Sequence, residues 1–171
     1  VEVQAKAGFV PNVFLALAHR PDEWRAFFAY HDALMLKTGG HLTKGDREMI
    51  VVATSAANDC LYCVVAHGAI LRIYEKKPLV ADQVATNWRK ADITPRQRAM
   101  LDFALKVCLR SGEIGEADYA ALREHGLDDE DAWDIIAITA FFGMSNRMAN
   151  GIGMLPNDEF YLMGRVPKTK G

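Results

Sequence analysis

Residues 46–68 read DREMIVVATSAANDCLYCVVAHG, and this stretch decides the fold that the chain adopts. Residues 50–57 are almost wholly apolar, which predicts a helix that is buried on every side. Asn58-Asp59 interrupts that pattern, and a second helix is predicted from about Cys60 to Tyr74. The stretch therefore predicts two consecutive helices that meet at a short turn.

The second of these helices begins with three reactive side chains. Positions i, i+3 and i+7 of an α-helix share a face, so Cys60, Cys63 and His67 project the same way. A thiol in the first turn feels the positive end of the helix dipole, which favours the thiolate, and an imidazole one turn further on can accept a thiol proton. Two cysteines at this spacing can also form a disulfide with little backbone movement. These features are the minimum that a thiol peroxidase or dithiol oxidoreductase requires.

Two other interpretations of the same residues stay open at this point. Cys60, Cys63 and His67 could be three ligands of a zinc ion, with Glu48 or His41 as the fourth, although one helix face does not easily arrange three ligands tetrahedrally. The same side chains could also belong to a non-catalytic oligomeric helical protein that has kept the motif.

The rest of the chain carries further helix signals and no strand signal. Apolar runs are long, helix-forming residues dominate, and apolar residues do not alternate with period two. A helix start is indicated by the first-turn proline Pro21, and capped starts are indicated at Thr43 with Asp46, at Thr94 with Gln97, and at Asp128. We therefore predict an all-α fold, a multi-helix domain with about seven or eight helices by this count of starts and stops.

A faint internal similarity relates Leu42–Gly68 to the segment 85 residues later in the chain. It places Thr54 on Thr139 and Cys60 on Ser145. The fold is therefore predicted to contain two weakly related helical halves, of which only the first has kept the reactive groups.

Size, charge and cysteine content restrict the class of protein. The chain has 171 residues and a net charge of −2, which fits one globular domain over residues 1–171 with a reactive core at 42–76. Neither nucleic acid nor a membrane surface is indicated as a partner, and no apolar run reaches transmembrane length. Three cysteines do not suggest a secreted disulfide framework. We expect a cytoplasmic protein without a signal peptide, whose cysteines form a disulfide only during turnover.

Three further residues with reactive side chains are predicted to be structural. Cys108 lies on the apolar stripe of the helix that begins after Thr94, and we predict that it is a core residue. His31 and His41 each stand alone, and a lone histidine in such a setting is more commonly a surface or packing residue than a ligand.

The spacing of Glu48, Cys60, Cys63 and His67 resembles that of the alkylhydroperoxidase D branch of the carboxymuconolactone decarboxylase-like superfamily. Within that branch the chain is most similar to the uncharacterised peroxidase-related members. The resemblance covers most of the chain, and the upstream glutamate at the matching distance makes it specific. Further matching stretches are Gly8–Asn12, Leu42-Thr43, Arg47-Glu48 and Asn146-Arg147.

The resemblance implies an all-helical fold that assembles into homotrimers or homohexamers and reduces organic hydroperoxides or hydrogen peroxide. It implies that Cys63 is the peroxidatic cysteine, which becomes a sulfenic acid, and that Cys60 is the resolving cysteine and proton donor. Glu48 and His67 match the relay that draws the proton from the thiol. The oxidised pair is expected to be re-reduced by a dithiol donor, for which protein-bound dihydrolipoamide is the known case, and neither a cofactor nor a metal is predicted.

One residue departs from the family pattern. The alkylhydroperoxidase D relay has a histidine immediately before the second cysteine, where this chain has Tyr62. A phenol is a poor proton acceptor near neutral pH, so a shorter relay is predicted. Helix-dipole physics alone makes Cys60 the more acidic thiol, but the proximity of His67 leads us to expect that Cys63 attacks. Lactone decarboxylation, another activity of the superfamily, is disfavoured because that branch lacks the CxxC pair.

Overall fold

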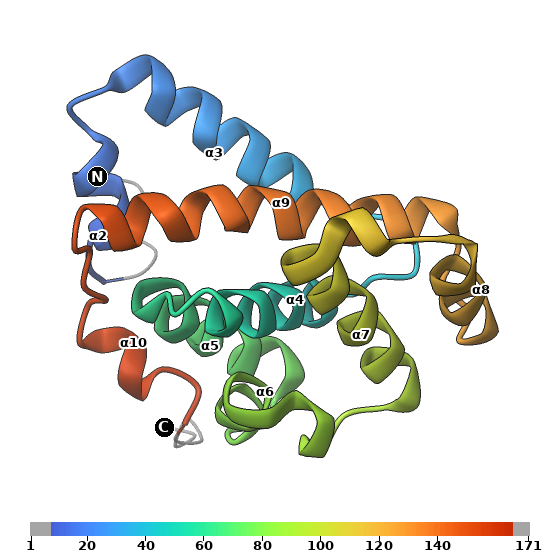
Figure 1. Cartoon of the computed structure of the whole chain (residues 1–171). Helices are drawn as coiled ribbons and strands as arrows, with labels where there is room; N and C mark the ends of the chain where they lie inside the picture. The colour runs from blue at the N-terminus through green and yellow to red at the C-terminus, as the bar shows by residue number, and fades with distance from the viewer. Residues whose placement is uncertain (1–7, 166–171) are drawn as a thin grey trace.

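The computed structural model describes residues 8–165, within which the chain forms nine α-helices, two short 3-10 helices and no strand (Figure 1). The predicted all-α fold is confirmed. The α-helices are α2 (Asn12–Leu17), α3 (Pro21–Met35), α4 (Lys44–Ala57), α5 (Leu61–Glu75), α6 (Val80–Asn87), α7 (Pro95–Arg110), α8 (Glu116–Glu124), α9 (Asp129–Gly151) and α10 (Glu159–Leu162). The 3-10 helices are η1 (Trp88–Lys90) and η2 (Ser111–Glu113). The helix beyond the predicted seven or eight is α10, which is too short to show a periodic pattern.

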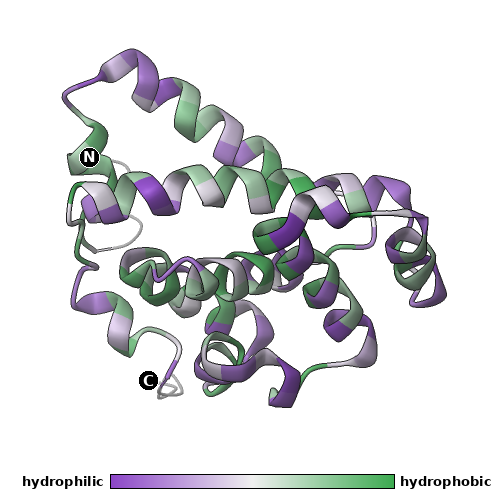
Figure 2. Ribbon diagram, viewed as in Figure 1, coloured by the Kyte–Doolittle hydropathy of each residue, from purple (hydrophilic) through white to green (hydrophobic). Residues whose placement is uncertain are grey.

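The core is built around α4. This helix packs against α5, α6, α7 and α9, and every residue from Gly45 to Ser55 is buried. The apolar residues 49–53 are enclosed on every face, as predicted, whereas the buried polar residues before them have hydrogen-bond or ion-pair partners and the last two residues of the helix reach the surface. Each large aliphatic side chain that is fully enclosed contributes about 1.5–3 kcal/mol, and residues 49–52 have no exposed surface. The hydrophobic colour in Figure 2 accordingly follows α4 and α5.

The long helix α9 lies between α3 and the central helix α4. It crosses the molecule in Figure 1, with α3 on one side and α4 on the other, and it packs against both. The internal sequence similarity relates α4 to the first half of α9, and the paired residues Thr54 and Thr139 are both buried. The two segments diverge beyond that point, because the chain turns at Asn58-Asp59 after α4, whereas α9 continues without a turn.

The predicted helix starts are confirmed. The hydroxyl of Thr43 accepts from the backbone N–H of Asp46 (3.0 Å), and the carboxylate of Asp46 accepts from the N–H of Thr43 (2.9 Å). Each reciprocal pair satisfies backbone donors that a helix start otherwise leaves free. The same arrangement opens α7 at Thr94 with Gln97 and α9 at Asp128 with Asp131.

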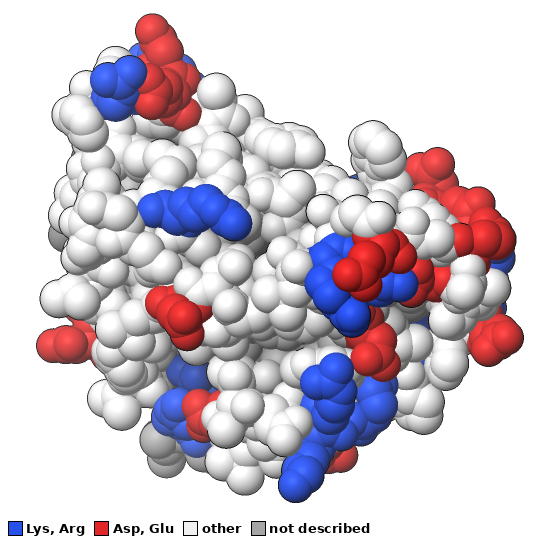
Figure 3. Space-filling view, in the orientation of Figure 1, with Lys and Arg blue, Asp and Glu red and all other residues white. Residues whose placement is uncertain are grey.

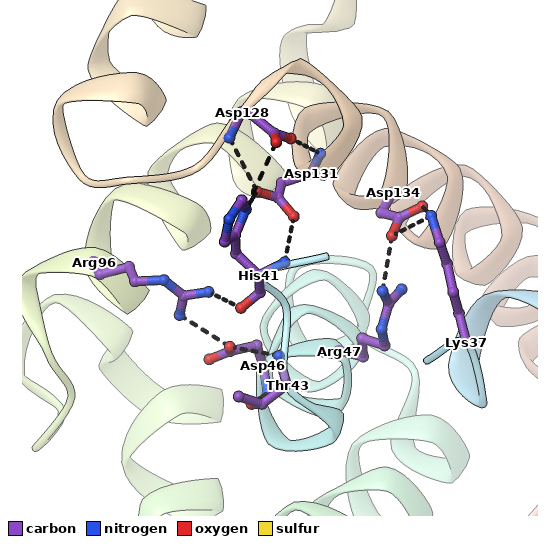
Figure 4. A network of polar contacts seen from close by, with 9 residues as sticks. All are labelled: Lys37, His41, Thr43, Asp46, Arg47, Arg96, Asp128, Asp131 and Asp134. Carbon is purple, nitrogen blue, oxygen red and sulfur yellow. Dashed lines mark hydrogen bonds and ion pairs between the residues drawn. The ribbon is translucent and has the colours of Figure 1, made fainter. Parts of the chain in front are cut away.

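A network of polar side chains ties the segment before α4 to the start of α9 (Figure 4). Asp131 accepts from the backbone N–H of His41 (2.9 Å) and contacts its ring (Nδ1 to Oδ2, 2.7 Å). Arg96 of α7 donates to Asp46 (2.9 Å) and also to the carbonyl of His41. These contacts hold segments that are distant in sequence around the first turn of α4. They thereby fix the position of Glu48, which follows that turn.

A buried ion pair in this network leads to a prediction about stability. Arg47 Nη2 donates to Asp134 Oδ2 (2.7 Å), and both side chains are almost fully buried. The substitution Asp134→Asn keeps the shape but leaves the Arg47 charge buried and unpaired, so we expect the free energy of unfolding to fall by about 3–5 kcal/mol. Urea denaturation followed by circular dichroism measures the change. The control is Asp22→Asn at an exposed ion pair with Arg25, where no measurable change is expected. Equal losses in the two variants would contradict the prediction.

The surface carries charges of both signs. On the face drawn in Figure 3, Lys and Arg side chains lie in small groups beside Asp and Glu, with wide uncharged areas between them. This face therefore offers no continuous surface of one sign to an extended polyanion. None of the helices described for residues 8–165 combines the length and the apolar composition that a membrane crossing needs.

Candidate active site

The turn between α4 and α5 places both cysteines at a helix start. Asp59 adopts a left-handed conformation (φ 53°), and the backbone N–H of Cys60 then donates to the carbonyl of Ser55 (2.9 Å). Cys60 is the residue that caps α5, and Cys63 lies in its first turn. Each cysteine is only 1% exposed. The predicted pair of helices and the predicted position of the thiols are confirmed, and both sulfurs are shielded from bulk solvent.

Glu48 and His67 are brought into contact by the packing of α4 against α5. His67 Nδ1 lies 2.7 Å from Glu48 Oε2, and the two side chains are 12% and 7% exposed. A carboxylate only accepts hydrogen bonds, so Nδ1 carries the hydrogen and donates it, which leaves Nε2 as the acceptor of the neutral ring. The structure therefore joins two of the four residues that the sequence singled out into an oriented carboxylate–imidazole pair.

An apolar cavity of about 230 Å³ lies beside the second cysteine. Among the residues described, Cys63 and His67 both line it, whereas Cys60 does not. Ser145 of α9 also lines it, with its hydroxyl 3.9 Å from Cys63 Sγ. The apolar part of the lining includes Phe14, Phe27, Phe28, Ile70, Phe142 and Phe160. A small apolar molecule in this cavity would meet the sulfur of Cys63 rather than that of Cys60.

Asn146 on α9 binds the end of α4 and the turn that precedes Cys60. Its Nδ2 donates to the hydroxyl of Ser55 (2.9 Å), and its Oδ1 accepts from Asn58 Nδ2 (2.9 Å). Its amide also lowers the pKa of both Cys60 and Cys63. Asn146 was noted in the sequence only as part of a family resemblance, because nothing local relates it to cysteines more than 80 residues away.

The two thiols of the pair differ in acidity. The hydrogen bond from the thiol of Cys63 lowers the pKa of Cys60 to about 6, with smaller contributions from the backbone N–H of Cys63, from Asn146 and from the charge of His67. The same contact and burial raise the pKa of Cys63. Of the two thiols, Cys60 is therefore the more acidic. Helix-dipole physics predicted this order of acidity.

Comparison with known proteins identifies the family. The profile of the carboxymuconolactone decarboxylase family matches residues 21–78. The chain is 85% identical to an alkylhydroperoxidase AhpD core structure, an uncharacterised peroxidase-related protein from Ralstonia eutropha JMP134 (TM-score 0.96, covering 98% of this chain and 87% of that one). The chain belongs to the alkylhydroperoxidase D-like family.

Two other solved structures show the range of this alkylhydroperoxidase D-like fold. An uncharacterised peroxidase-related protein from Silicibacter sp. TM1040 is 45% identical (TM-score 0.91, covering 95% of this chain and 84% of that one). The debrominase Bmp8, solved with 2,3,4-tribromopyrrole, is 21% identical (TM-score 0.75, covering 94% and 85%) and shares the fold. A search of curated proteins gave no match.

Tyr62 has a structural role in this alkylhydroperoxidase D-like chain, at the position where the family pattern has a relay histidine. The hydroxyl oxygen of Tyr62 accepts from the backbone N–H of Val13 (3.3 Å), and its ring lines the cavity. Burial raises the pKa of Tyr62 to about 12. The phenol thus stays protonated at neutral pH and packs the segment before α3 against α5, so it has no capacity to accept a proton from the thiols.

The zinc interpretation does not agree with the geometry. Within residues 8–165, the one group of three His, Cys, Asp or Glu side chains with ligand atoms within 4.8 Å of one another is His41, Asp128 and Asp131. Its carboxylates already accept from backbone N–H groups at the start of α9. His41 lies in that group and not beside the cysteines, so it is not available as a fourth ligand.

Two other residues with reactive side chains, Cys108 and His31, differ in their relation to the cavity. Cys108 is half-buried on α7, makes only long contacts with the carbonyl of Thr54 (3.9 Å) and with Asn58 Oδ1 (3.8 Å), and has its pKa raised by burial. Cys108 therefore packs at the edge of the core, and the prediction that it is a core residue is only partly correct, because its stripe of α7 is not fully covered. His31, in contrast, lines the same cavity as Cys63, which its isolated position in the sequence did not indicate.

Proposed function

We propose that the chain is a thiol-dependent peroxidase that reduces organic hydroperoxides or hydrogen peroxide through Cys60 and Cys63. The observation that carries this proposal is the shared cavity of Cys63 and His67, because it gives an apolar peroxide access to one sulfur of an acidic cysteine pair. Membership of a peroxidase-related family supports it. The contact between His67 and Glu48 supplies a place for the proton that the pair must lose.

The first step prepares the nucleophile. His67 accepts one proton from the cysteine pair, and the carboxylate of Glu48 stabilises the resulting imidazolium and keeps its ring in place. One proton then remains on the pair, and the lower pKa of Cys60 favours its residence on Cys63. When this proton moves from Cys63 to Cys60, the thiolate lies on the sulfur that faces the cavity.

The second step is attack on the peroxide. The thiolate of Cys63 attacks the terminal oxygen, a sulfur–oxygen bond forms, and the oxygen–oxygen bond breaks. Cys63 becomes a sulfenic acid, and the departing alkoxide takes the proton from Cys60 and leaves as the alcohol. The peroxide is reduced by two electrons, and Cys60 becomes the thiolate.

The third step closes the disulfide. The thiolate of Cys60 attacks the sulfur of Cys63, the sulfur–sulfur bond forms, and hydroxide leaves with the proton of the His67 imidazolium as water. A dithiol donor, for example protein-bound dihydrolipoamide, then exchanges with this disulfide and restores both thiols while it becomes oxidised itself. The buried position of the sulfurs favours a small or extended donor that can enter the cavity.

Two further properties belong to the same proposal. Exposed apolar side chains on α3 and α9, including Tyr30, Trp133 and Met144, suit a homotrimer or homohexamer of the kind that the family resemblance implies. A catalytic pair that must return to the dithiol state also suits the reducing environment of the cytoplasm.

The proposed function is tested by measuring peroxide consumption by the wild-type protein. Hydrogen peroxide, tert-butyl hydroperoxide and cumene hydroperoxide are each supplied with dithiothreitol or dihydrolipoamide. We expect consumption that depends on the dithiol, and mass spectrometry after one equivalent of peroxide is expected to show a Cys60–Cys63 disulfide. The variant Cys108→Ser serves as the control and is expected to behave as the wild type. Absence of turnover with all three peroxides and both donors would reject the proposal.

A further inference from the structure

His31 is a second imidazole in the wall of the cavity that contains Cys63. It lies on α3, whereas Cys63 and His67 lie on α5, so only the tertiary structure brings the two imidazoles together. Their ring centroids are 6.4 Å apart, and the ring of Phe142 lies 6.3 Å from His31 and 4.7 Å from His67. The redox steps described above use His67 and leave His31 without a role.

A hydrogen bond determines which nitrogen of His31 is available. Nδ1 lies 2.9 Å from Asp32 Oδ1, and because a carboxylate only accepts, Nδ1 carries the hydrogen. The lone pair of the neutral ring is therefore on Nε2. Burial lowers the pKa of His31, and this effect outweighs the opposing influence of Asp32 and Glu48. His31 therefore contributes a hydrogen-bond acceptor to a cavity whose lining is largely apolar.

A hydroperoxide needs such an acceptor. It has one O–H group, on the terminal oxygen that a thiolate attacks, and an O–H left without an acceptor in an apolar cavity is unfavourable. Two other polar side chains of the cavity are held elsewhere: the hydroxyl oxygen of Tyr62 accepts from the backbone N–H of Val13, and His67 is held by Glu48 for proton transfer. The hydroxyl of Ser145 lies 3.9 Å from Cys63 Sγ and can donate as well as accept, whereas Nε2 of the neutral His31 ring can only accept. His31 is therefore the cavity group that best matches a substrate O–H.

We propose that His31 binds and orients the hydroperoxide by accepting a hydrogen bond from its O–H at Nε2, while the organic group lies against Phe27 and Phe28. This role rests on the peroxidase function proposed above. The hydrogen bond holds the terminal oxygen beside Cys63 Sγ. No proton moves to His31, because the hydrogen stays on that oxygen when it becomes part of the sulfenic acid.

The test compares the rate at which cumene hydroperoxide oxidises Cys63 in the wild type, in His31→Phe and in His31→Gln. Phenylalanine fills a similar volume without an acceptor, whereas the glutamine amide oxygen can accept. We expect oxidation to slow about 10- to 100-fold in the phenylalanine variant and to recover at least partly in the glutamine variant. The rates come from quenched-flow mass spectrometry, and His31→Leu replaces the phenylalanine variant if that protein does not fold.

Two control reactions separate substrate binding from a structural role. Methyl methanethiosulfonate modifies thiols but has no hydrogen-bond donor, so its rate of reaction with Cys63 is expected to be the same in all variants. Reduction of the preformed disulfide by dithiothreitol is also expected to be unchanged. Equal rates of peroxide oxidation in the wild type and His31→Phe would overturn the role of His31. Equal slowing of the reactions with peroxide and with methyl methanethiosulfonate would overturn it too. Neither result would affect the proposed peroxidase function. A wild-type protein that does not react with peroxide would overturn the proposed function and this role with it.

Discussion

Replacing Cys63 by serine is expected to lower the rate of peroxide reduction about 10³-fold or more. In Cys60→Ser we expect Cys63 to be oxidised once by peroxide, but we expect no catalytic turnover. Cys63 lines the cavity and Cys60 does not, so only the first can meet the peroxide. Without Cys60 the sulfenic acid on Cys63 has no neighbouring thiolate to resolve it, and the reaction stops there. The stalled sulfenic acid is measured by mass spectrometry after trapping with dimedone.

The same two variants decide between acidity and access as the property that selects the attacking sulfur. Cys60 has the lower pKa, about 6, because the thiol of Cys63 donates to it. If acidity alone decided, Cys63→Ser would still be oxidised, and the dimedone adduct would appear on Cys60. That result would reverse the assigned roles. Cys108→Ser is the matched control for removal of a half-buried thiol outside the cavity, and no change in peroxide consumption is expected.

Glu48→Gln is expected to lower kcat/KM for peroxide by about 10²- to 10⁴-fold while the fold stays intact. The glutamine side chain has the same length, and its amide oxygen can still accept from His67 Nδ1, so the ring keeps its orientation. It has no negative charge to stabilise the imidazolium that forms when His67 takes a proton from the cysteines. Steady-state kinetics with cumene hydroperoxide and dihydrolipoamide measure the loss.

The control for this loss is Glu124→Gln, which removes an exposed carboxylate on α8. Its kcat/KM is expected to equal that of the wild type. The unfolding midpoints of both variants are expected to stay close to the midpoint of the wild type. A kcat/KM for Glu48→Gln within twofold of the wild type would show that the contact between Glu48 and His67 is structural only.

Much of the fold could be predicted because its signals are local. The starts of α4, α7 and α9 depend on residues three positions apart, and the structure contains the two predicted capping pairs and the predicted cap at Asp128. The all-round apolar character of α4 marked it as the central helix. The position of the cysteines at the start of α5 also follows from nearby residues, since Asn58-Asp59 makes the turn that begins this helix.

The candidate site was only partly predictable for the opposite reason. The family resemblance implied a relay of Glu48 and His67, but their contact across 19 residues depends on how α4 packs against α5. Asn146 and His31 reach the site from α9 and α3, and no pattern within a few residues of either relates it to a cysteine. His31 was accordingly expected to be a surface or packing residue.

The sequence by itself determined an all-α chain with a buried central helix, and a second helix that presents two cysteines and a histidine on one face. The tertiary structure decided which sulfur faces a cavity, which imidazoles line it, and which groups shift the pKa values of the two thiols. The physical reason is range: helix formation and capping depend on residues within one turn, whereas a cavity depends on the distances between helices that are remote in sequence.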